Sequence, residues 1–245
     1  MIRTIGIYIY AGLVVIGTLL HLPKAKKLSK QKSSAEINEK LFEQPKMVSR
    51  KVMERTGSTV YVKGQEKLPD GAVLFVANHQ GLFDILALIG YLGKPVGFIA
   101  KKEIEKLPII SSWMEMIHCV FIDRKDRRQS VRAINRGIDY LKQGHSIVIF
   151  PEGTRSRGSN LNDFKPGSFR LAIKANVPIV PVAIDGTYQM LEEDEGRVKA
   201  STVSLRIEDP IYPEDYQNKK SGEIAAQAQD IIQKSLQGKT SEQTA

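Results

Sequence analysis

The sequence predicts an α/β fold with a mixed, largely parallel sheet flanked by helices, and an N-terminal helical membrane-anchoring segment. Short apolar runs alternate with helical patterns along most of the 245 residues, as is typical of βαβ units. Two of these runs lead directly into polar or charged turns, which is where open α/β sheets place ligands. A charge-free apolar stretch near the N-terminus supplies the expected anchor.

The expected strands are short apolar runs bounded by turn-forming residues. They lie near residues 59–63, 72–77, 95–100, 119–123, 146–150, 178–184 and 202–208. Helices are expected near residues 84–92, 103–117, 127–143, 167–176 and 221–236. We therefore divide the chain into N-terminal membrane-associated helices with a basic linker (1–56), an α/β domain (57–236) and a polar, disordered tail (237–245).

The anchor is the uncharged stretch Ile5–Leu20. As a helix it would be about 24 Å long, or about 27 Å if extended to Leu22, against a hydrocarbon core of about 30 Å. It therefore either spans with help from flanking residues or embeds in one leaflet. A cleaved signal peptide is the runner-up, although no small-x-small cleavage site precedes the basic stretch.

Lysines follow the anchor directly, at Lys24, Lys26, Lys27, Lys30 and Lys32. If the anchor spans, they favour a cytoplasmic position for the rest of the chain. If it embeds, they lie on an anionic membrane surface on the same side. Both alternatives predict the cytoplasmic face of the cell membrane.

A second helix is expected over about residues 35–56. Ile37, Leu41, Val48 and Val52 fall on one face at four- and seven-residue steps. Pro45 is expected to kink or split this helix. The apolar face either packs against the domain or lies on the membrane.

Composition narrows the class of partner. The net charge of +9 and the pI of about 9.5 suggest nucleic acid or an anionic membrane surface. Aromatic residues are not interleaved with the basic ones and no recognised nucleic-acid motif is present, so we expect no nucleic acid. The single Cys119 excludes an intrachain disulfide. A single cysteine and only four scattered histidines also argue against a metal site. No nucleotide phosphate loop or dinucleotide fingerprint is found, and we expect no bound cofactor.

His79 and Asp84 are the first candidate catalytic residues. His79 follows the apolar run Val73–Ala77, and Asp84 stands five residues later near a predicted helix N-terminus. Asp84 can then accept from one ring nitrogen of His79 and leave the other free to take a proton. The pair is the base half of a Ser-His-Asp triad without its serine, so the hydroxyl would belong to a substrate. On spacing alone, a helix cap or a solvated loop is the alternative.

A second apolar run, Ile147–Phe150, leads into the turn Pro151–Ser156. Gly153 lets the backbone approach a ligand, and Thr154 can donate to oxygen. Arg155 brings a planar fork suited to two phosphate oxygens. We therefore predict that this turn binds an anion. The alternative is a solvated basic loop in which Glu152 pairs with an arginine.

Four segments in order resemble the motifs of the glycerolipid acyltransferases. The resemblance covers about residues 59–208, and its motifs are His79–Asp84 (the His-x4-Asp pattern), Phe121–Arg124, Phe150–Arg155 and Val177–Val182. One such motif would be weak, whereas four in order are highly specific. The chain departs from the family at His118-Cys119, where members often carry glycine just before the second motif.

The resemblance implies an activity and a set of partners. It implies transfer of a fatty acyl group from acyl-CoA or acyl carrier protein (ACP) to the sn-2 hydroxyl of lysophosphatidic acid (1-acyl-sn-glycerol 3-phosphate), giving phosphatidic acid for phospholipid biosynthesis. Glycerol 3-phosphate or another lysolipid is the alternative acceptor. His79 and Asp84 would be catalytic, and the acceptor's phosphate would bind Arg155, Arg124 and Lys101. Glu152 would contact the glycerol portion or orient Arg155. Lys101 is also compatible with a solvated surface lysine.

Two further points stay open from sequence. The apolar cluster Trp113, Met114, Met116 and Ile117 is interpreted as core, with an acyl-chain groove as the alternative. Oxyanion donors are expected in the 79–84 turn or the 152–154 turn. The rival classes are a non-catalytic membrane-binding module, a nucleic-acid binder and a hydrolase.

Overall fold

The computed structural model describes residues 1–238, and within them seven strands form one sheet in the order β1-β7-β6-β2-β5-β3-β4. The strands are β1 (Thr59–Lys63), β2 (Leu74–Ala77), β3 (Val96–Lys101), β4 (Val120–Ile122), β5 (Ser146–Ile149), β6 (Ile179–Asp185) and β7 (Thr202–Ile207). Only the β6–β7 pair is antiparallel among the strand pairs of this sheet. The predicted mixed, largely parallel sheet is confirmed.

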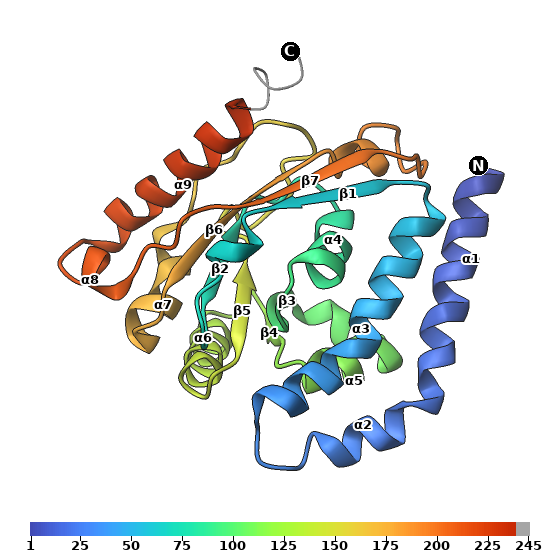
Figure 1. The fold of residues 1–245 in the computed structure, drawn as a ribbon, viewed down its shortest axis with the longest axis horizontal. Coiled ribbons are helices and arrows are strands. Elements are labelled where there is room, and N and C mark those ends of the chain that lie inside the picture. The colour runs from blue at the N-terminus through green and yellow to red at the C-terminus, as the bar shows by residue number, and fades with distance from the viewer. Residues whose placement is uncertain (239–245) are drawn as a thin grey trace.

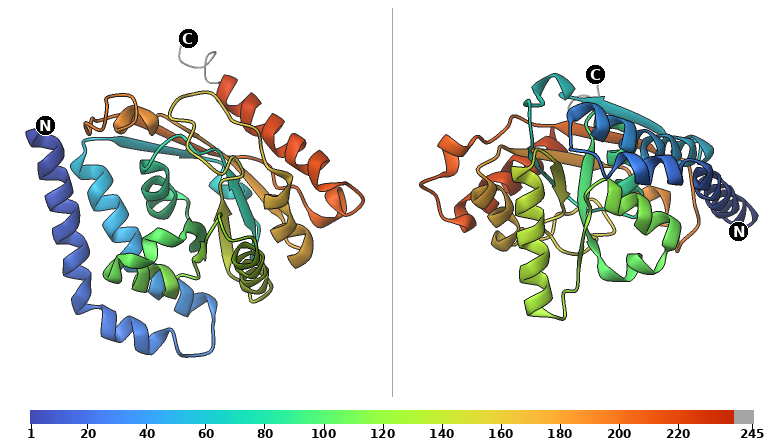
Figure 2. Two further views of the ribbon diagram at one scale, coloured as in Figure 1. Left: turned by 180° about the vertical axis from the view of Figure 1, so that it is seen from behind. Right: turned by 90° about the horizontal axis from the view of Figure 1, so that it is seen from below.

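The sheet is covered on both faces, as Figures 1 and 2 show. Alternate residues of β2 point to opposite sides, as strand geometry requires. Phe75 and Ala77 join a core with α1 (Ile2–Gly17), α3 (Ala35–Arg55) and α4 (Phe83–Tyr91). Leu74 and Val76 join a second core with α6 (Arg127–Lys142), α7 (Arg170–Ala175) and α9 (Ser221–Gln237). Because both faces are buried, the central strands are continuously apolar, which explains why they were predictable as apolar runs.

Two predicted helices are broken by local backbone chemistry. The expected helix over 103–117 is a 3₁₀ turn, η3 (Lys102–Lys106), followed by α5 (Pro108–Met116). Leu107 between them is extended, because the ring of Pro108 disfavours the helical region at the preceding residue. The expected helix over 167–176 begins as η4 (Pro166–Phe169) before α7. The left-handed Asn176 ends α7.

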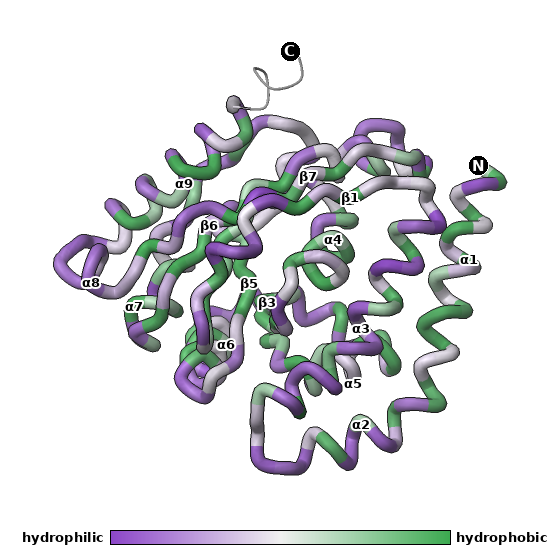
Figure 3. Tube along the Cα trace, in the orientation of Figure 1, coloured by the Kyte–Doolittle hydropathy of each residue, from purple (hydrophilic) through white to green (hydrophobic). Residues whose placement is uncertain are grey.

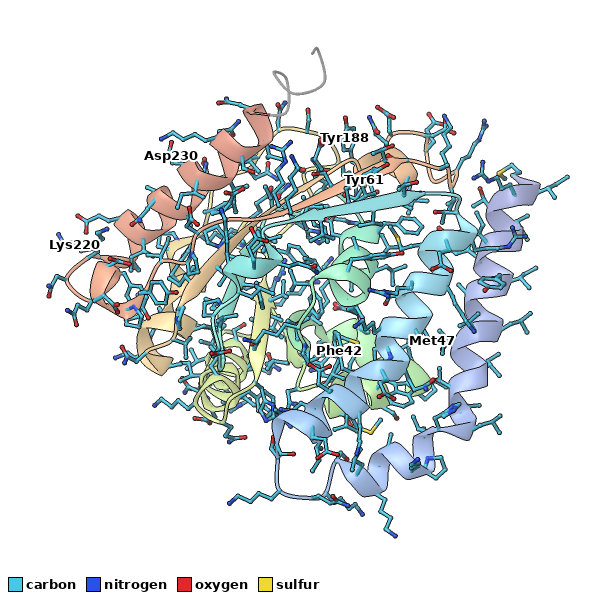
Figure 4. The ribbon with its side chains drawn as sticks, viewed as in Figure 1. Phe42, Met47, Tyr61, Tyr188, Lys220 and Asp230 are labelled. Atoms are coloured by element: carbon cyan, nitrogen blue, oxygen red, sulfur yellow. The ribbon has the colours of Figure 1, made fainter. Side chains whose placement is uncertain are left out.

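The helices of the N-terminal region begin and end at other residues than expected. The apolar anchor begins earlier than expected and consists of α1 and η1 (Thr18–Leu20), and the unpredicted α2 (Leu22–Leu28) carries the first lysines. Pro45 does not split α3, which runs through it without a break. Tertiary packing holds α3 together, since it lies along α4 and α1 and buries Phe42 and Met53. The side chain of Phe42 is labelled in Figure 4.

The apolar face of α3 packs against the domain, which was the first of its two expected roles. Figure 3 shows that α1, in contrast, is hydrophobic along most of its length. Ile2–Leu20 is the one stretch of the described residues that is long and apolar enough to cross a membrane. Only 17% of its most apolar window is buried. Two short elements, η2 (Gln65–Lys67) and η5 (Tyr188–Met190), and the unpredicted α8 (Pro213–Tyr216) complete the fold.

The polar tail expected at 237–245 is only partly visible. Gln237 is the last residue of α9 and Gly238 follows it. The remainder, 239–245, lies outside the described residues.

Candidate active site

The site lies where the carboxyl ends of β2 and β5 meet. These two strands are parallel neighbours, with Val76 opposite Ile149, so the turn after each strand emerges at the same edge of the sheet. The turn after β2 holds His79 and leads into α4, and the turn after β5 holds Glu152 to Arg155. The strand order therefore brings together two motifs that are more than seventy residues apart in the sequence.

His79 and Asp84 form the expected pair. Nδ1 of His79 lies 2.7 Å from Oδ2 of Asp84, whose side chain is fully buried at the start of α4. The ring of His79 stacks on Phe150, with centroids 4.0 Å apart and planes 15° from parallel. Within the described chain, Nε2 of His79 has no hydrogen-bond partner, and His79 lines a cavity. The imidazole is therefore held by its inner nitrogen and presents its outer nitrogen to the cavity.

Asp84 is held by more than His79. The amide of Gly81 donates to Oδ2 of Asp84 over 3.0 Å. The hydroxyl of Thr187, a fully buried residue just after β6, donates to Oδ1. Three donors thus surround one buried carboxylate, which compensates its loss of water.

Glu152 joins the two turns rather than facing the cavity. It is 2% exposed, and its Oε1 accepts from the amide of His79 over 2.6 Å. Its Oε2 accepts from the backbone and side-chain nitrogens of Asn162, at 3.0 and 2.7 Å. Burial raises the pKa of Glu152, and these N–H donors act in the opposite direction. The turn after β5 adds a further link, because Ser156 donates its amide to the carbonyl of His79 over 2.7 Å.

Arg155 is paired with a residue that sequence reasoning missed. Its Nη1 lies 2.8 Å from Oε1 of Glu192, so Glu192 and not Glu152 orients it. Arg124 donates to the carbonyl of Gly153, whose backbone is left-handed with φ of 73°. Arg124, Thr154 and Arg155 all line the cavity. Lys101, at the end of β3, lines it as well, while the neighbouring Lys102 pairs with Asp123 at 3.7 Å.

The cavity itself has a volume of about 1100 Å³ and two kinds of wall. The apolar wall comes from α1, α3, α4 and α5, and includes Ile7, Ala11, Val48, Val52, Ile85, Leu86, Ile89, Trp113, Met114 and Ile117. The polar wall comes from the end of β3, the turns after β4 and β5 and the first residues of α6 and α7, and it carries Lys101, Arg124, Arg127, Arg155, Arg157, Lys165 and Arg170. No Asp or Glu of the described chain lines it. Such a cavity suits a molecule with a long apolar chain and an anionic head.

The apolar cluster on α5 divides between its two expected roles. Trp113 and Met116 are both 7% exposed and pack with Leu41 of α3. Trp113 also lines the cavity, together with Met114 and Ile117. The cluster is therefore core on one side and cavity wall on the other.

Among the described residues, neither an ionised thiol nor a metal-binding cluster accompanies the His79–Asp84 pair. Cys119 lines the cavity, but burial raises the pKa of its thiol to about 12, which keeps it protonated. The described residues contain no group of three or more His, Cys, Asp or Glu placed to hold a metal ion.

A histidine paired with a buried carboxylate at the end of parallel strands, beside a cavity with an apolar and a cationic wall, is an arrangement typical of group-transfer enzymes. The chain belongs to the acyltransferase family, whose sequence pattern matches residues 59–185 and so both motifs of the site.

Particular relatives agree with this family. The chain is 38% identical to a chloroplast 1-acyl-sn-glycerol-3-phosphate acyltransferase of Arabidopsis thaliana over 62% of this chain, and spans 44% of that protein's length. It is 33% identical to a probable 1-acyl-sn-glycerol-3-phosphate acyltransferase of Mycoplasma pneumoniae over 74% of this chain and 75% of that one. Its fold resembles the crystal structure of the 1-acyl-sn-glycerophosphate acyltransferase PlsC from Thermotoga maritima, with a TM-score of 0.84 and 25% identity. That match covers 98% of this chain and 95% of the Thermotoga chain.

Proposed function

We propose that this protein transfers a fatty acyl group from an acyl thioester to the sn-2 hydroxyl of 1-acyl-sn-glycerol 3-phosphate, giving phosphatidic acid. The observation that carries the proposal is the His79–Asp84 pair, which faces a cavity with one apolar and one cationic wall. The names of the relatives support the same reaction. Lysophosphatidic acid and an acyl donor are the substrates that these names imply.

The chemical step follows from the free nitrogen of His79. Nε2 takes the proton of the acceptor's hydroxyl as its oxygen attacks the thioester carbonyl. Asp84 stabilises the imidazolium that forms, by the hydrogen bond at Nδ1. The tetrahedral intermediate then collapses, the carbon–sulfur bond breaks, and His79 returns the proton to the leaving thiolate. No acyl-enzyme is needed.

The oxyanion requires N–H donors that are not already used. The amides of His79, Gly81 and Leu82 donate to the carboxylates of Glu152, Asp84 and Glu192, respectively. The amides of Thr154 and Arg155, and that of Phe83 at the start of α4, have no acceptor among the described residues. All three residues line the cavity. We assign oxyanion stabilisation to this second group of amides.

The acceptor's phosphate would bind Arg155 and Arg124, with Thr154 and Lys101 beside them. Arg155 offers the planar fork, and Arg124 fixes the carbonyl of Gly153 so that the turn is held open toward the cavity. Glu152 would act through the position of His79 rather than by contact with glycerol. The donor is acyl-ACP or acyl-CoA, since both carry phosphopantetheine and both suit the cationic wall.

The N-terminal helix would hold the enzyme at the membrane. The Oγ1 of Thr4 accepts from the amide of Val198 over 3.0 Å, and the Oγ1 of Thr18 accepts from Nε1 of Trp113 over 2.9 Å. Both ends of α1 are therefore tied to the same domain, which favours a helix embedded in one leaflet over one that spans. Large apolar residues are exposed along its outer side, namely Ile2, Ile5, Tyr8, Ile9, Leu13, Ile16, Leu19 and Leu20.

The lysines in α2 and those that follow it would then lie against an anionic membrane surface, on the cytoplasmic face of the cell membrane. In this proposal residues 1–56 are the membrane-associated part and residues 57–236 the acyltransferase domain.

A transfer assay tests the proposal directly. Wild type and His79→Ala, purified in detergent or reconstituted in vesicles, are given labelled lysophosphatidic acid with acyl-CoA or acyl-ACP. We expect phosphatidic acid from the wild type and a loss of about 10²–10⁴-fold in the variant. If product forms with glycerol 3-phosphate or another lysolipid but not with lysophosphatidic acid, that molecule is the acceptor instead. Equal behaviour of wild type and variant, with lipid binding but no product, would instead indicate a membrane-binding module.

A further inference from the structure

Glu192 lies behind the site and contacts both of its turns. Its side chain is 5% exposed and follows η5, in a segment outside all four sequence motifs. Oε1 of Glu192 accepts from the amide of Leu82 and from Nη1 of Arg155, each over 2.8 Å. Oε2 is buried and has no hydrogen-bond partner. A buried carboxylate with one unsatisfied oxygen is costly, so the contacts of its other oxygen require an explanation.

The two donors belong to the two halves of the site. Leu82 is the N-cap of α4, directly after the His79 turn, and Arg155 belongs to the turn after β5. The chain leaves room for the carboxylate at Gly81, where an added Cβ would lie 2.3 Å from Oε2 of Glu192. One carboxylate oxygen thus fixes the arginine relative to the segment that carries the base.

The contact leaves Arg155 able to bind phosphate. Glu192 engages Nη1 alone, and the other N–H groups of this guanidinium have no acceptor among the described residues. Arg155 is 37% exposed on its side chain and lines the cavity. A guanidinium has five N–H donors in a rigid plane, so it can hold Glu192 and a phosphate together.

We propose that Glu192 is a positioning residue for the acceptor's phosphate: it holds Arg155 at a set place relative to His79 and so favours acceptors that carry a phosphate. This inference rests on the proposed function. It predicts that Glu192 acts through Arg155, and that its removal affects phosphate-bearing acceptors more than acceptors without phosphate.

Kinetics of five variants test this role. Glu192→Ala should raise the KM for lysophosphatidic acid by about tenfold or more, with a smaller change in kcat and an unchanged donor KM. Glu192→Gln keeps an acceptor oxygen and should lie closer to the wild type. With 1-monoacylglycerol, which lacks the phosphate, Glu192→Ala and wild type should be similar. Glu193→Ala, at the exposed neighbouring position, is the matched control.

The remaining two variants are Arg155→Ala alone and its combination with Glu192→Ala. If Glu192 acts through Arg155, the double variant should have the same acceptor KM as Arg155→Ala alone. A further rise in KM in the double variant, or an equal effect of Glu192→Ala on both acceptors, would overturn the inference and leave the proposed function standing. No transfer by the wild type to any acceptor would overturn both.

Thermal unfolding supplies a readout that is independent of catalysis. Arg155→Ala leaves the buried carboxylate of Glu192 without its cationic partner and with only the amide of Leu82 donating to it, which is destabilising. The Tm of Arg155→Ala should therefore be lower than that of the double variant, which no longer contains the buried carboxylate of Glu192. A double variant less stable than Arg155→Ala would show that Glu192 does not depend on Arg155 for its pairing.

Discussion

The main-chain amide of His79 donates to the side chain of Glu152 over 2.6 Å. His79, the candidate base of one motif, is thus held by the carboxylate of another motif. Because β2 and β5 are parallel neighbours, this contact, together with the bond from the amide of Ser156 to the carbonyl of His79, sets the position of the His79 turn relative to the turn after β5. Glu152 is therefore a structural link inside the site, and its replacement should be felt at His79.

Replacing Glu152 should reduce both stability and turnover. In Glu152→Gln the side-chain nitrogen must face either the amide of His79 or the two nitrogens of Asn162, so one side of the link becomes donor against donor. We expect a loss of about 1–3 kcal/mol in the free energy of unfolding, and a fall of about tenfold or more in kcat. Denaturant unfolding and the transfer assay measure these effects. Asn162→Ala is the control, and should lower stability with a smaller effect on kcat. A fully stable and active Glu152→Gln would contradict the link.

Replacing Thr187 should affect turnover rather than binding. Thr187→Val removes the hydroxyl that donates to Oδ1 of Asp84 and keeps the shape of the side chain. The buried carboxylate then orients His79 less precisely, and we expect kcat to fall by about tenfold while both KM values stay near those of the wild type. Thr187→Ser, which retains the hydroxyl, should recover most of the activity. A rise in KM with unchanged kcat would show that Thr187 serves the binding site instead.

Membrane binding should depend on the outer face of α1. Ile9 and Leu13 are 59% and 62% exposed, and Figure 4 shows side chains projecting outward along this helix. Burying such a side chain is worth about 1.5–3 kcal/mol. Ile9→Ser/Leu13→Ser should therefore lower co-sedimentation with anionic vesicles by about 10²-fold or more. Tyr61→Ser is the matched control, since Tyr61 is 60% exposed but lies on β1. Equal losses for the two would argue against α1 as the membrane contact.

The free energy of unfolding should decrease as the pH falls below about 6.5, the ordinary pKa of histidine. The ring of His118 stacks on His145 with centroids 3.4 Å apart, and burial lowers the pKa of His118 to about 4, with His145 and Arg136 acting in the same direction. Between pH 6.5 and 4 the unfolded chain binds the extra proton, so stability is full above pH 6.5 and is lost as the pH falls through this window. The loss is at most about 3 kcal/mol.

His118→Asn tests this assignment. His118 has φ of 62°, a left-handed conformation that explains why glycine suits this position and that asparagine also tolerates. The variant should show a smaller decrease in the free energy of unfolding from pH 6.5 to pH 5, measured by urea titration at each pH. An unchanged slope would assign the pH dependence to other groups.

Local pattern was sufficient for most of the framework. The central strands are buried on both faces, so their apolar runs were visible without any knowledge of their partners. The turns that follow β2 and β5 carry His79, Asp84 and Arg155 in a fixed local order, which made them recognisable. Errors arose where local rules compete, as at Pro108, which begins α5 and separates it from η3, and at Pro45, which does not interrupt α3.

The sequence by itself determined the α/β class, the two turns that hold the candidate base and phosphate-binding arginine, and the apolar N-terminal helix. Only the tertiary structure decided what supports them. Thr187 contacts Asp84 and Glu192 contacts Leu82, at separations of 103 and 110 along the chain. No periodicity or motif marks such residues, because the strand order and the packing of the loop after β6 place them. The same holds for the α1–η1 stretch: its apolar composition is visible in the sequence, but its docking at both ends depends on contacts with Val198 and Trp113.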